Sequence, residues 1–448
     1  MDLNRDGLSD KKNSMSNQKQ HKGFLRLLPG VQTLWRILLS VGPGIFCIGY
    51  TIGTGSVTSM SKAGSQFGTR FLWILFFSCL FSWVLMEAYG RYAIITGRTA
   101  IHSFKTKFKF GRFFAILAII LVSLGQWCCL SGIVGLSSSA IYETIHLVNP
   151  SADSDPYLPV LAIAIIIMIC MYLVLWVGTY SLFEKILIVF VTILGLSFLI
   201  SMFLVLPSPE QIIKGFVPSV PRLEGAGLIM AAFVGTTMAA PTFVVRPLLL
   251  KEKGWTATHY KQQRKDSFTS ALFMFIISGS IMICAAGALY NNGKSIDSVL
   301  DMANSLEPFA GKFATALFLV GILSAGLSST LPIMMVAPLL ISDYKQGQMV
   351  TRSVLFRSLT AVACLMGLLV PVLGVNPILA QIATQIAQVF VLPLIVGGII
   401  ILVNSRDMKG HRGGILLNSG LVASFIFSLI MSYIALLSLK EFLLREIF

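Results

Sequence analysis

Charged side chains are scarce in this sequence. Asp, Glu, Lys and Arg together make up 12% of its 448 residues, against about 25% in soluble domains, while apolar residues make up 55%. So few charges cannot cover the surface of a soluble globule of this length. The sequence therefore excludes a soluble globular enzyme, and its polar segments are too short to form a separate soluble domain.

The side chains that catalysis inside a membrane requires are also missing. The five histidines fall in polar segments, and neither an HExxH nor a GxSxG motif lies in an apolar stretch. The hydroxyls of Ser328 and Ser329 have no base to activate them. The seven cysteines are odd in number and show no CxxC spacing, which favours packing roles over disulfides or zinc sites. We expect no enzymatic activity and no cofactor.

Long apolar stretches are what the sequence has in abundance. Eleven stretches of about 20 residues or more follow one another, and each can cross a hydrocarbon core of about 30 Å as a helix. We expect an all-α integral membrane protein with a polar tail over residues 1–34, one transmembrane transporter domain over 35–440 and a short C-terminal tail over 441–448. The predicted spans are 36–61, 69–90, 113–141, 157–177, 182–206, 225–249, 268–290, 312–342, 354–374, 377–403 and 414–439.

The net charge of +15 follows a topological pattern. With these spans, 26 of the 34 basic residues fall on the side of the N-terminus and 8 on the other side. Basic loops mark the cytoplasmic side, which predicts a plasma-membrane protein with its N-terminus in the cytoplasm and its C-terminus outside. The loops at 98–109 and 251–265 would contact anionic lipid headgroups, at about 1 kcal/mol per basic residue. The charge therefore predicts lipids rather than nucleic acid as partners, and we expect a monomer.

Two of the predicted spans share glycine-rich interruptions. In the first span, 42–44 (Gly-Pro-Gly) precedes 53–56 (Gly-Thr-Gly-Ser); in the sixth, 225–227 (Gly-Ala-Gly) precedes 235–238 (Gly-Thr-Thr-Met), with Pro241 behind it. Interrupted helices at matching positions are typical of a five-plus-five inverted repeat whose breaks meet at the substrate site. Close packing of helices at glycine is the alternative. The matched positions favour the repeat, with the eleventh helix outside it.

Four segments resemble the NRAMP family of proton-coupled divalent-metal transporters, which have the LeuT-type fold. They are 42–44 (Gly-Pro-Gly), 63–73 (AGSQFGTRFLW), 95–97 (Ile-Thr-Gly) and 324–330 (SAGLSST), and helix order agrees over about residues 36–440. The resemblance implies a LeuT-type fold with helices 1 and 6 broken. It also implies a secondary transporter that works by alternating access.

The resemblance fails where the family binds its metal. The family's Asp-Pro-Gly-Asn motif falls on residues 53–56, so Gly53 replaces the metal-binding Asp and Ser56 replaces the Asn. The family's methionine falls on Ala239, or on Met238 after a slip of one residue. Transition metals need anionic or strongly dipolar ligands, and a thioether favours them over harder ions. The sequence therefore resembles a divergent member without the usual metal ligands.

The residues of the family's proton path are missing as well. Its helix 3 acids fall near Cys129 and Gly132, and its second helix 6 histidine falls near Arg246. At membrane depth the sequence leaves one acid, Glu87. We therefore expect transport that is not coupled to protons.

Neutral oxygen atoms remain at the predicted substrate site. Hydroxyls, freed carbonyls and the amides of helix 10 suit a hard, largely hydrated cation such as Mg²⁺. These amides are Gln381, Gln385 and Gln388, whose spacing of i, i+4 and i+7 places them on one inward helix face. Two alternatives stay open: helix dipoles and Arg246 would favour a small anion or organic solute, or the protein has lost transport. The predicted substrate-binding residues are Gly53, Thr54, Gly55, Ser56, Thr236, Thr237, Met238, Ala239, Gln381 and Gln385.

Four charged residues are candidates for coupling or gating: Glu87, Arg91, Glu184 and Arg246. Glu87 and Arg91 are one helical turn apart and would form an ion pair. The alternative is that Glu87 carries the coupling proton in place of the missing acids. Glu184, at the start of helix 5, would anchor the inner gate or lie at the level of the lipid headgroups.

Overall fold

The structure is a computed structural model that describes residues 42–148, 156–177, 180–219, 221, 225–290, 296 and 307–447. The chain divides into residues 1–41, which lie outside the described part, and a compact unit that begins at Gly42. The predicted tail over 1–34 and the predicted start of the first span at 36–41 therefore lie outside the described residues. Those that are described form helices and no strand, which confirms the all-α prediction.

The described residues contain ten segments that are long and apolar enough to cross a membrane. The pair α3 (Gly44–Thr51) and α4 (Thr54–Phe67) corresponds to the first predicted span, interrupted in its middle, and completes the set of eleven. The other helices are α5 (Leu72–Thr96), α6 (Ala100–Lys107), α7 (Gly111–Val148), α8 (Tyr157–Val177), α9 (Tyr180–Leu204), α10 (Pro209–Lys214), α11 (Ala226–Thr237), α12 (Ala240–Glu252), η1 (Ala257–His259), α13 (Tyr260–Leu289), α15 (Glu307–Gln346), α16 (Val354–Gly367), α17 (Leu369–Leu373), α18 (Pro377–Val389), α19 (Leu392–Val403), η3 (Arg406–Met408) and α20 (Ile415–Ile447).

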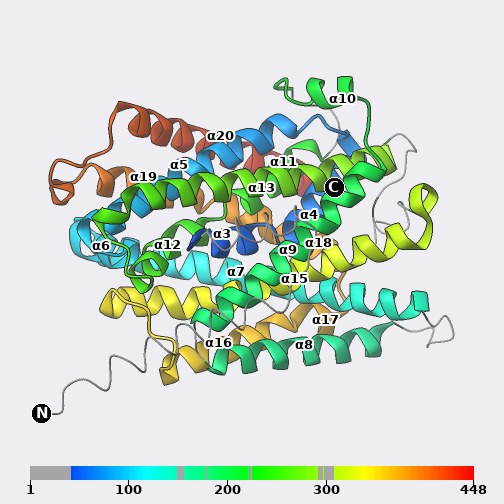
Figure 1. The fold of residues 1–448 in the computed structure, drawn as a ribbon, viewed down its shortest axis with the longest axis horizontal. Coiled ribbons are helices and arrows are strands. Elements are labelled where there is room, and N and C mark those ends of the chain that lie inside the picture. The colour runs from blue at the N-terminus through cyan, green and yellow to red at the C-terminus, as the bar shows by residue number, and fades with distance from the viewer. Residues whose placement is uncertain are drawn as a thin grey trace, which may run out of the picture. The chain divides into compact units, whose positions relative to one another are not determined.

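The two interrupted helices form the centre of the bundle. Every residue of α3 is buried, and in Figure 1 this helix lies in the middle of the unit. α3 packs against α12, and α4 packs against α11. Since the first half of one helix meets the second half of the other, the two run antiparallel, as an inverted repeat requires.

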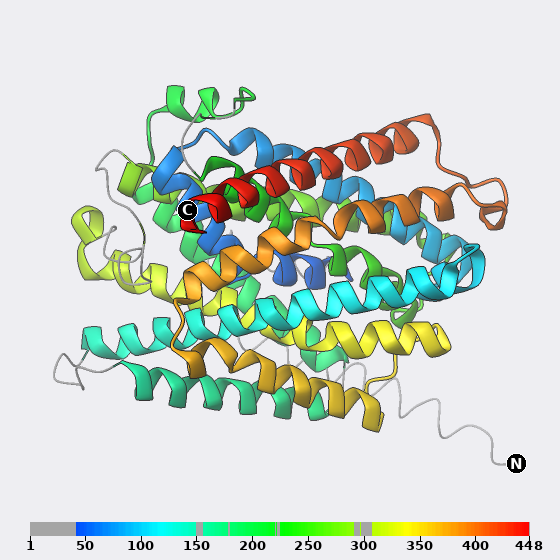
Figure 2. The ribbon, with the colours of Figure 1, turned by 180° about the vertical axis from the view of Figure 1, so that it is seen from behind.

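The remaining helices surround this centre. α7, α15 and α18 pack around the breaks, and α13 covers α4. α8, α16 and α17 lie along one side of the unit, whereas α5, α19 and α20 lie along the opposite side (Figures 1 and 2). The outer helices expose large apolar side chains, which fits a surface that faces lipid.

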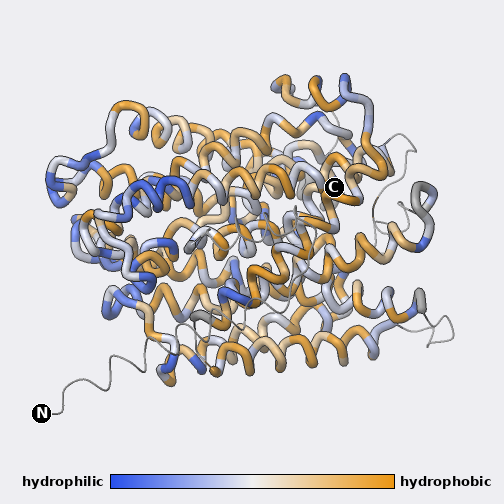
Figure 3. The backbone as a smooth tube through the Cα atoms, in the orientation of Figure 1, coloured by the Kyte–Doolittle hydropathy of each residue, from blue (hydrophilic) through white to orange (hydrophobic). Residues whose placement is uncertain are grey.

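Polar residues gather at the ends of the helices, as Figure 3 shows. At one end, α6, the last turn of α12, the end of α15 and η3 meet. Lys251 Nζ donates to Gly347 O at 2.8 Å, and both Arg98 and Lys107 pair with Asp407. This end includes the basic loops at 98–109 and 251–265, which the sequence analysis assigns to the cytoplasmic side.

Several helices extend beyond the predicted spans, and two of these extensions contain acids. α13 begins at Tyr260, two turns before the predicted span 268–290, and α15 continues to Gln346, beyond 312–342. These extensions place Asp266 and Asp343 inside helices, where they are 4% and 0% exposed. Buried acids other than Glu87 therefore lie within the long helices. Hydropathy missed the extensions because the terminal turns are polar, although both acids are buried against neighbouring helices.

Candidate functional site

Two short breaks interrupt the central helices. Ile52 and Gly53 separate α3 from α4, and Gly53 is extended, with φ −90° and ψ −173°. Met238 and Ala239 separate α11 from α12. Across the breaks, the Thr236 hydroxyl approaches the Thr51 carbonyl at 3.5 Å. The breaks are narrower than the predicted 53–56 and 235–241, because the glycines that follow or precede them remain helical.

Neighbouring helices come too close to the first break for any side chain. A Cβ atom at Gly53 would lie 2.8 Å from Ser329 Cβ of α15. A Cβ atom at Gly55 would lie 3.1 Å from Gln381 Oε1 of α18 and closer still to Gln385. In this conformation Ser329 of α15 lies where a side chain at position 53 would begin, so a carboxylate there would require Ser329 or α15 to shift.

A small cavity lies where the breaks meet. Its volume is about 20 Å³, close to the minimum of about 10–15 Å³ that admits one water molecule. Five of the predicted substrate-binding residues line it, and Thr54, Ser56, Thr237, Met238 and Gln381 do not. The lining residues are Tyr50, Gly53, Gly55, Gln126, Cys129, Ile133, Thr236, Ala239, Ile333, Gln385 and Gln388.

The cavity wall includes residues that sequence reasoning missed. Tyr50 of α3 and Gln126 of α7 border it, and neither the Tyr50 hydroxyl nor the Gln126 carboxamide forms a regular hydrogen bond. The signal for Gln126 was available, since it is an amide within an otherwise apolar span. Cys129, which the resemblance placed at a lost proton-path position, also lines the cavity.

A ladder of amides closes one side of the site. Ser59 of α4 donates to Gln385 Oε1, Gln385 Nε2 donates to Gln381 Oε1 at 3.1 Å, and Gln381 Nε2 donates to the Cys129 carbonyl at 3.0 Å. The predicted stripe of helix 10 glutamines thus faces the interior, with Gln388 also buried. The ladder joins α4, α18 and α7, so Gln381 supports the cavity from behind.

Hydroxyl groups already satisfy several carbonyls at the breaks. Ser329 donates to Gly49 O at 3.0 Å, and Ser82 donates to Thr237 O at 3.1 Å. By contrast, the buried hydroxyls of Thr54 and Ser56 have no hydrogen-bond partner. Fewer carbonyls are thus available to a substrate than the sequence analysis assumed. The side-chain oxygens of the cavity wall remain the main groups that could bind a cation.

The cavity carries no formal charge. Its lining contains no Asp, Glu, Lys, Arg or His, and nowhere in the described residues do three His, Cys, Asp or Glu side chains gather as a metal site would require. Moving an ion into neutral, buried surroundings is costly unless it keeps water or gains strong dipoles. The site therefore lacks the charge compensation that a bare divalent ion needs.

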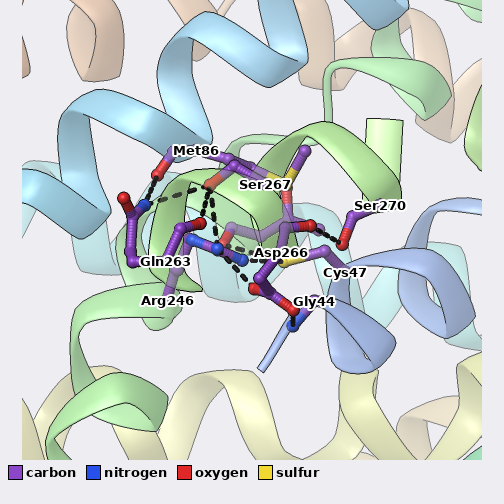
Figure 4. A network of polar contacts seen from close by, with 9 residues as sticks. Gly44, Cys47, Met86, Arg246, Gln263, Asp266, Ser267 and Ser270 are labelled. Carbon is purple, nitrogen blue, oxygen red and sulfur yellow. Dashed lines mark hydrogen bonds and ion pairs between the residues drawn. The ribbon is translucent and has the colours of Figure 1, made fainter. Parts of the chain in front are cut away.

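A buried ion pair lies on the α12 side of the breaks (Figure 4). Arg246 of α12 donates to Asp266 Oδ2 of α13 at 2.6 Å and to Ser267 Oγ at 2.9 Å, and both charged side chains are at most 1% exposed. The other oxygen, Asp266 Oδ1, accepts from Gly44 N of α3 at 3.3 Å. One carboxylate therefore ties together the first turn of α3 and the middle of α12.

The pair changes the role expected for Arg246. The sequence analysis treated this guanidinium as a positive charge that would attract an anion. Asp266 neutralises it within hydrogen-bonding distance, and Arg246 does not line the cavity. The pairing weakens the alternative of an anionic substrate. The sequence analysis placed Asp266 in a loop, because its burial against α12 depends on tertiary packing.

The other two predicted charged contacts lie nearer the basic end. Arg91 donates to Glu87 Oε1 at 3.1 Å, which confirms the predicted pair, and Tyr260 donates to the same oxygen at 3.2 Å. Glu184 of α9 pairs with Lys253 at 2.5 Å, so it joins α9 to the segment after α12. Neither glutamate lines the cavity.

The chain matches a known protein family over most of its length. Residues 44–438 match the family described as "Natural resistance-associated macrophage protein-like", or Nramp. The chain belongs to the Nramp family. The resemblance seen in the sequence is thereby confirmed, and so is a multi-pass membrane protein.

Curated relatives of this Nramp protein share a low identity over most of their length. The "Divalent metal cation transporter MntH" of Caldanaerobacter subterraneus subsp. tengcongensis is 22% identical over 413 residues, covering 88% of this chain and 92% of the relative. The protein of the same description from Bacillus subtilis is 24% identical over 405 residues, covering 87% of each.

Solved structures confirm the fold. The Eremococcus coleocola manganese transporter superimposes with a TM-score of 0.70 at 16% identity, covering 91% of this chain and 87% of that one. Mhp1, a nucleobase-cation-symport-1 family transporter in a closed conformation, superimposes with a TM-score of 0.58 at 14% identity, covering 89% and 90%. The Nramp chain therefore has the predicted LeuT-type fold.

The close approach at the first break generates a prediction. Gly53→Ala should lower the stability of the protein by about 1–3 kcal/mol, because the new methyl group overpacks against Ser329. Adding Ser329→Gly should recover part of this loss. Gly279→Ala is the control, because its Cβ atom would lie 3.6 Å from Leu75. Unfolding in detergent gives the stability of the wild type, the two single variants and the double variant. A double variant no more stable than Gly53→Ala would contradict the steric account.

The buried ion pair generates a second prediction. Arg246→Met should destabilise the protein by about 3–5 kcal/mol, because it leaves the Asp266 charge buried without its partner. The double variant Arg246→Met/Asp266→Leu should be more stable than either single variant. Denaturation in mixed micelles gives the coupling energy. Additive losses in the double variant would show that the two side chains act independently.

Proposed function

We propose that this Nramp protein is an alternating-access secondary transporter of divalent metal cations, and that it prefers a hard, largely hydrated ion such as Mg²⁺. The observation that carries the proposal is the uncharged cavity at two antiparallel helix breaks, whose wall includes amide and hydroxyl side chains. The family membership and the printed descriptions of the relatives, "Divalent metal cation transporter" and "manganese transporter", support transport of a divalent cation.

The donor chemistry supports the preference for a hard ion. Gln126, Gln385, Gln388 and Thr236 offer neutral oxygens, whereas the Met238 thioether does not line the cavity. Mg²⁺ gives up its water reluctantly and is usually bound through several retained waters. Amide and hydroxyl oxygens can accept hydrogen bonds from those waters without supplying a charge. The Cys129 thiol is the one soft group in the wall, and it donates to Gln381 Oε1 at 3.6 Å.

The cavity volume supports an occluded conformation. A space of about 20 Å³ holds about one water molecule, which is far too little for a hydrated ion. Substrate entry therefore requires that α3 or α11 move away from the scaffold helices, as alternating access provides. The Asp266 contacts to Gly44 and Arg246 keep α3 closed on α12 and α13 in this conformation.

An anionic substrate has less support than a cation. Asp266 neutralises Arg246, and the cavity lining contains no other basic residue. Loss of transport is the second alternative. The uptake experiment below separates it from the proposed function, because a protein without transport takes up none of the offered ions.

Proton coupling also lacks a carrier at the cavity. Glu87 pairs with Arg91 and accepts from Tyr260, away from the lining residues. We propose that the cation moves down its own gradient and the membrane potential, which supplies about 2.3 kcal/mol per charge per 100 mV. We further propose that the basic end, with α6 and η3, faces the cytoplasm, as the charge distribution favours.

Selectivity tests the substrate. In proteoliposomes, uptake should be measurable for Mg²⁺ and weak for Mn²⁺ and Cd²⁺. Gln385→Leu should reduce Mg²⁺ uptake at least about tenfold, because it removes an amide from the cavity wall. Ala387→Leu, on the exposed face of the same helix, is the matched control. Micromolar binding of Mn²⁺ or Cd²⁺ by calorimetry would overturn the hard-ion preference.

Internal pH tests the coupling. With a pH-sensitive dye inside the vesicles, uptake of the cation should not acidify the lumen, and imposed pH gradients should not drive uptake. Glu87→Gln should leave this independence unchanged. If the wild-type vesicles acidify in step with uptake and the variant's vesicles do not, Glu87 carries the proton and the uncoupled mechanism is wrong.

A further inference from the structure

A polar pocket of about 290 Å³ lies at the basic end, apart from the cavity at the breaks. Three segments form it: the turn into α6, the last turn of α12 and the turn that ends α15. Gly347, with φ +63°, lies in the turn that ends α15 and brings this turn against α6. A Cβ atom at Gly347 would lie 3.4 Å from the His102 ring. The pocket is lined by Gly97, Arg98, Thr99, His102, Thr106, Lys251, Gln346 and Gly347.

The charged groups of this pocket are basic. One guanidinium nitrogen of Arg98 lies 3.1 Å from Asp407 Oδ2, and Lys251 Nζ donates to Gly347 O at 2.8 Å. Each side chain carries further N–H groups. Asp407 is also shared with Lys107, so a single carboxylate serves two cations. Positive charge is therefore left over at the pocket.

A buried acid lies directly behind the pocket wall. Asp343 of α15 accepts the Thr99 hydroxyl and Ile101 N at 3.1 Å, so its carboxylate caps the first turn of α6. That arrangement satisfies the end of the helix and leaves the Arg98 and Lys251 side chains to face the pocket. Neither Asp343 nor Asp407 is among the lining residues.

His102 adds a polar atom without a partner. Its Nδ1 is buried and forms no hydrogen bond, although the ring lines the pocket. Burial lowers the pKa of His102, and the charges of Lys105, Arg98 and Lys251 lower it further. A ligand that satisfied the imidazole and neutralised the surrounding cations would remove both penalties.

We propose that this pocket, named here the basic pocket, binds a phosphate group. Arg98 offers a planar fork of donors and Lys251 a point charge, with the His102 imidazole beside them, and these groups match the several oxygens of a phosphate. The Thr99 and Thr106 hydroxyls already donate to Asp343 and to the His102 carbonyl. The group belongs either to free phosphate or a phosphorylated solute, or to the headgroup of an anionic lipid, because the pocket opens where basic loops approach the membrane surface.

Binding there has a consequence for transport, which rests on the proposed function. Lys251 belongs to α12, which contacts α3, whereas Arg98 lies between α5 and α6 and His102 lies within α6. A phosphate bridging these elements would hold α12 in place and slow the opening of the basic end. The basic pocket is then an inhibitory site separate from the substrate cavity.

The binding test uses the full chain in maltoside micelles, which carry no phosphate. In one arm inorganic phosphate is titrated against chloride at equal ionic strength; in the other, phosphatidic acid is added to the micelles. The unfolding midpoint should rise in at least one arm, because a ligand that binds the folded state stabilises it. A rise with phosphate alone identifies a free ligand, and a rise with lipid alone identifies a headgroup. No rise in either arm overturns the proposal.

Variants locate the site. Arg98→Gln and Lys251→Gln should each weaken binding about tenfold or more, because each removes a charge-assisted hydrogen bond. Lys265→Gln, an exposed cation at the start of α13, should bind as the wild type does. Equal binding by all three variants would place the ligand elsewhere.

A measurement on the wild type guards against variants that fail to fold. Saturating ligand should protect His102 from modification by diethyl pyrocarbonate, and an unchanged rate of modification would overturn the proposal. Phosphate inside vesicles should also slow uptake of the substrate. Because binding and protection need no transport, failure of the basic pocket and failure of the proposed function are distinguishable.

Discussion

A bilayer offers no water to backbone groups that leave a helix, and this constraint organises the whole unit. Two interrupted helices at its centre expose N–H and C=O groups that need partners within the protein. Ser329 and Ser82 supply hydroxyls to carbonyls beside the breaks, and the glutamines of α18 supply a ladder of amides. The surrounding helices must approach closely to reach these groups, which is why glycine occupies position 53.

The same close approach fixes the chemistry of the cavity. α15 fills the volume that a carboxylate at position 53 would need, so its loss is built into the packing of the helices and is not an isolated substitution. What remains is a ring of neutral oxygens, one thiol and apolar side chains. Such a ring can orient water around a cation but cannot neutralise its charge, and this favours an ion that keeps its hydration shell.

Charge is concentrated away from the cavity. Asp266 pairs with Arg246 and accepts a hydrogen bond from the first turn of α3. Glu87 pairs with Arg91, and Glu184 pairs with Lys253. The Asp266 contacts link α13 with α3 and α12, and the Glu184 contact links α9 with the segment after α12, whereas the Glu87–Arg91 pair lies within α5. Truncating one partner of the fully buried pair leaves the other charge without compensation, so this contact stabilises a closed arrangement strongly. The structure thus separates a neutral transport path from charged contacts that hold the closed state.

Much of this could be predicted from the sequence. Hydropathy located the spans, because a helix in lipid must be apolar over about 20 residues. Paired glycine interruptions identified the broken helices, and the spacing of Gln381, Gln385 and Gln388 placed them on one face. The Glu87–Arg91 pair followed from its one-turn spacing. These features are local, so neighbouring residues along the chain determine them. Tertiary structure alone decided the partner of Arg246, since Asp266 is 20 residues away on another helix. It also decided that Tyr50 and Gln126 border the cavity while Met238 does not, because those positions depend on how helices rotate and pack against one another.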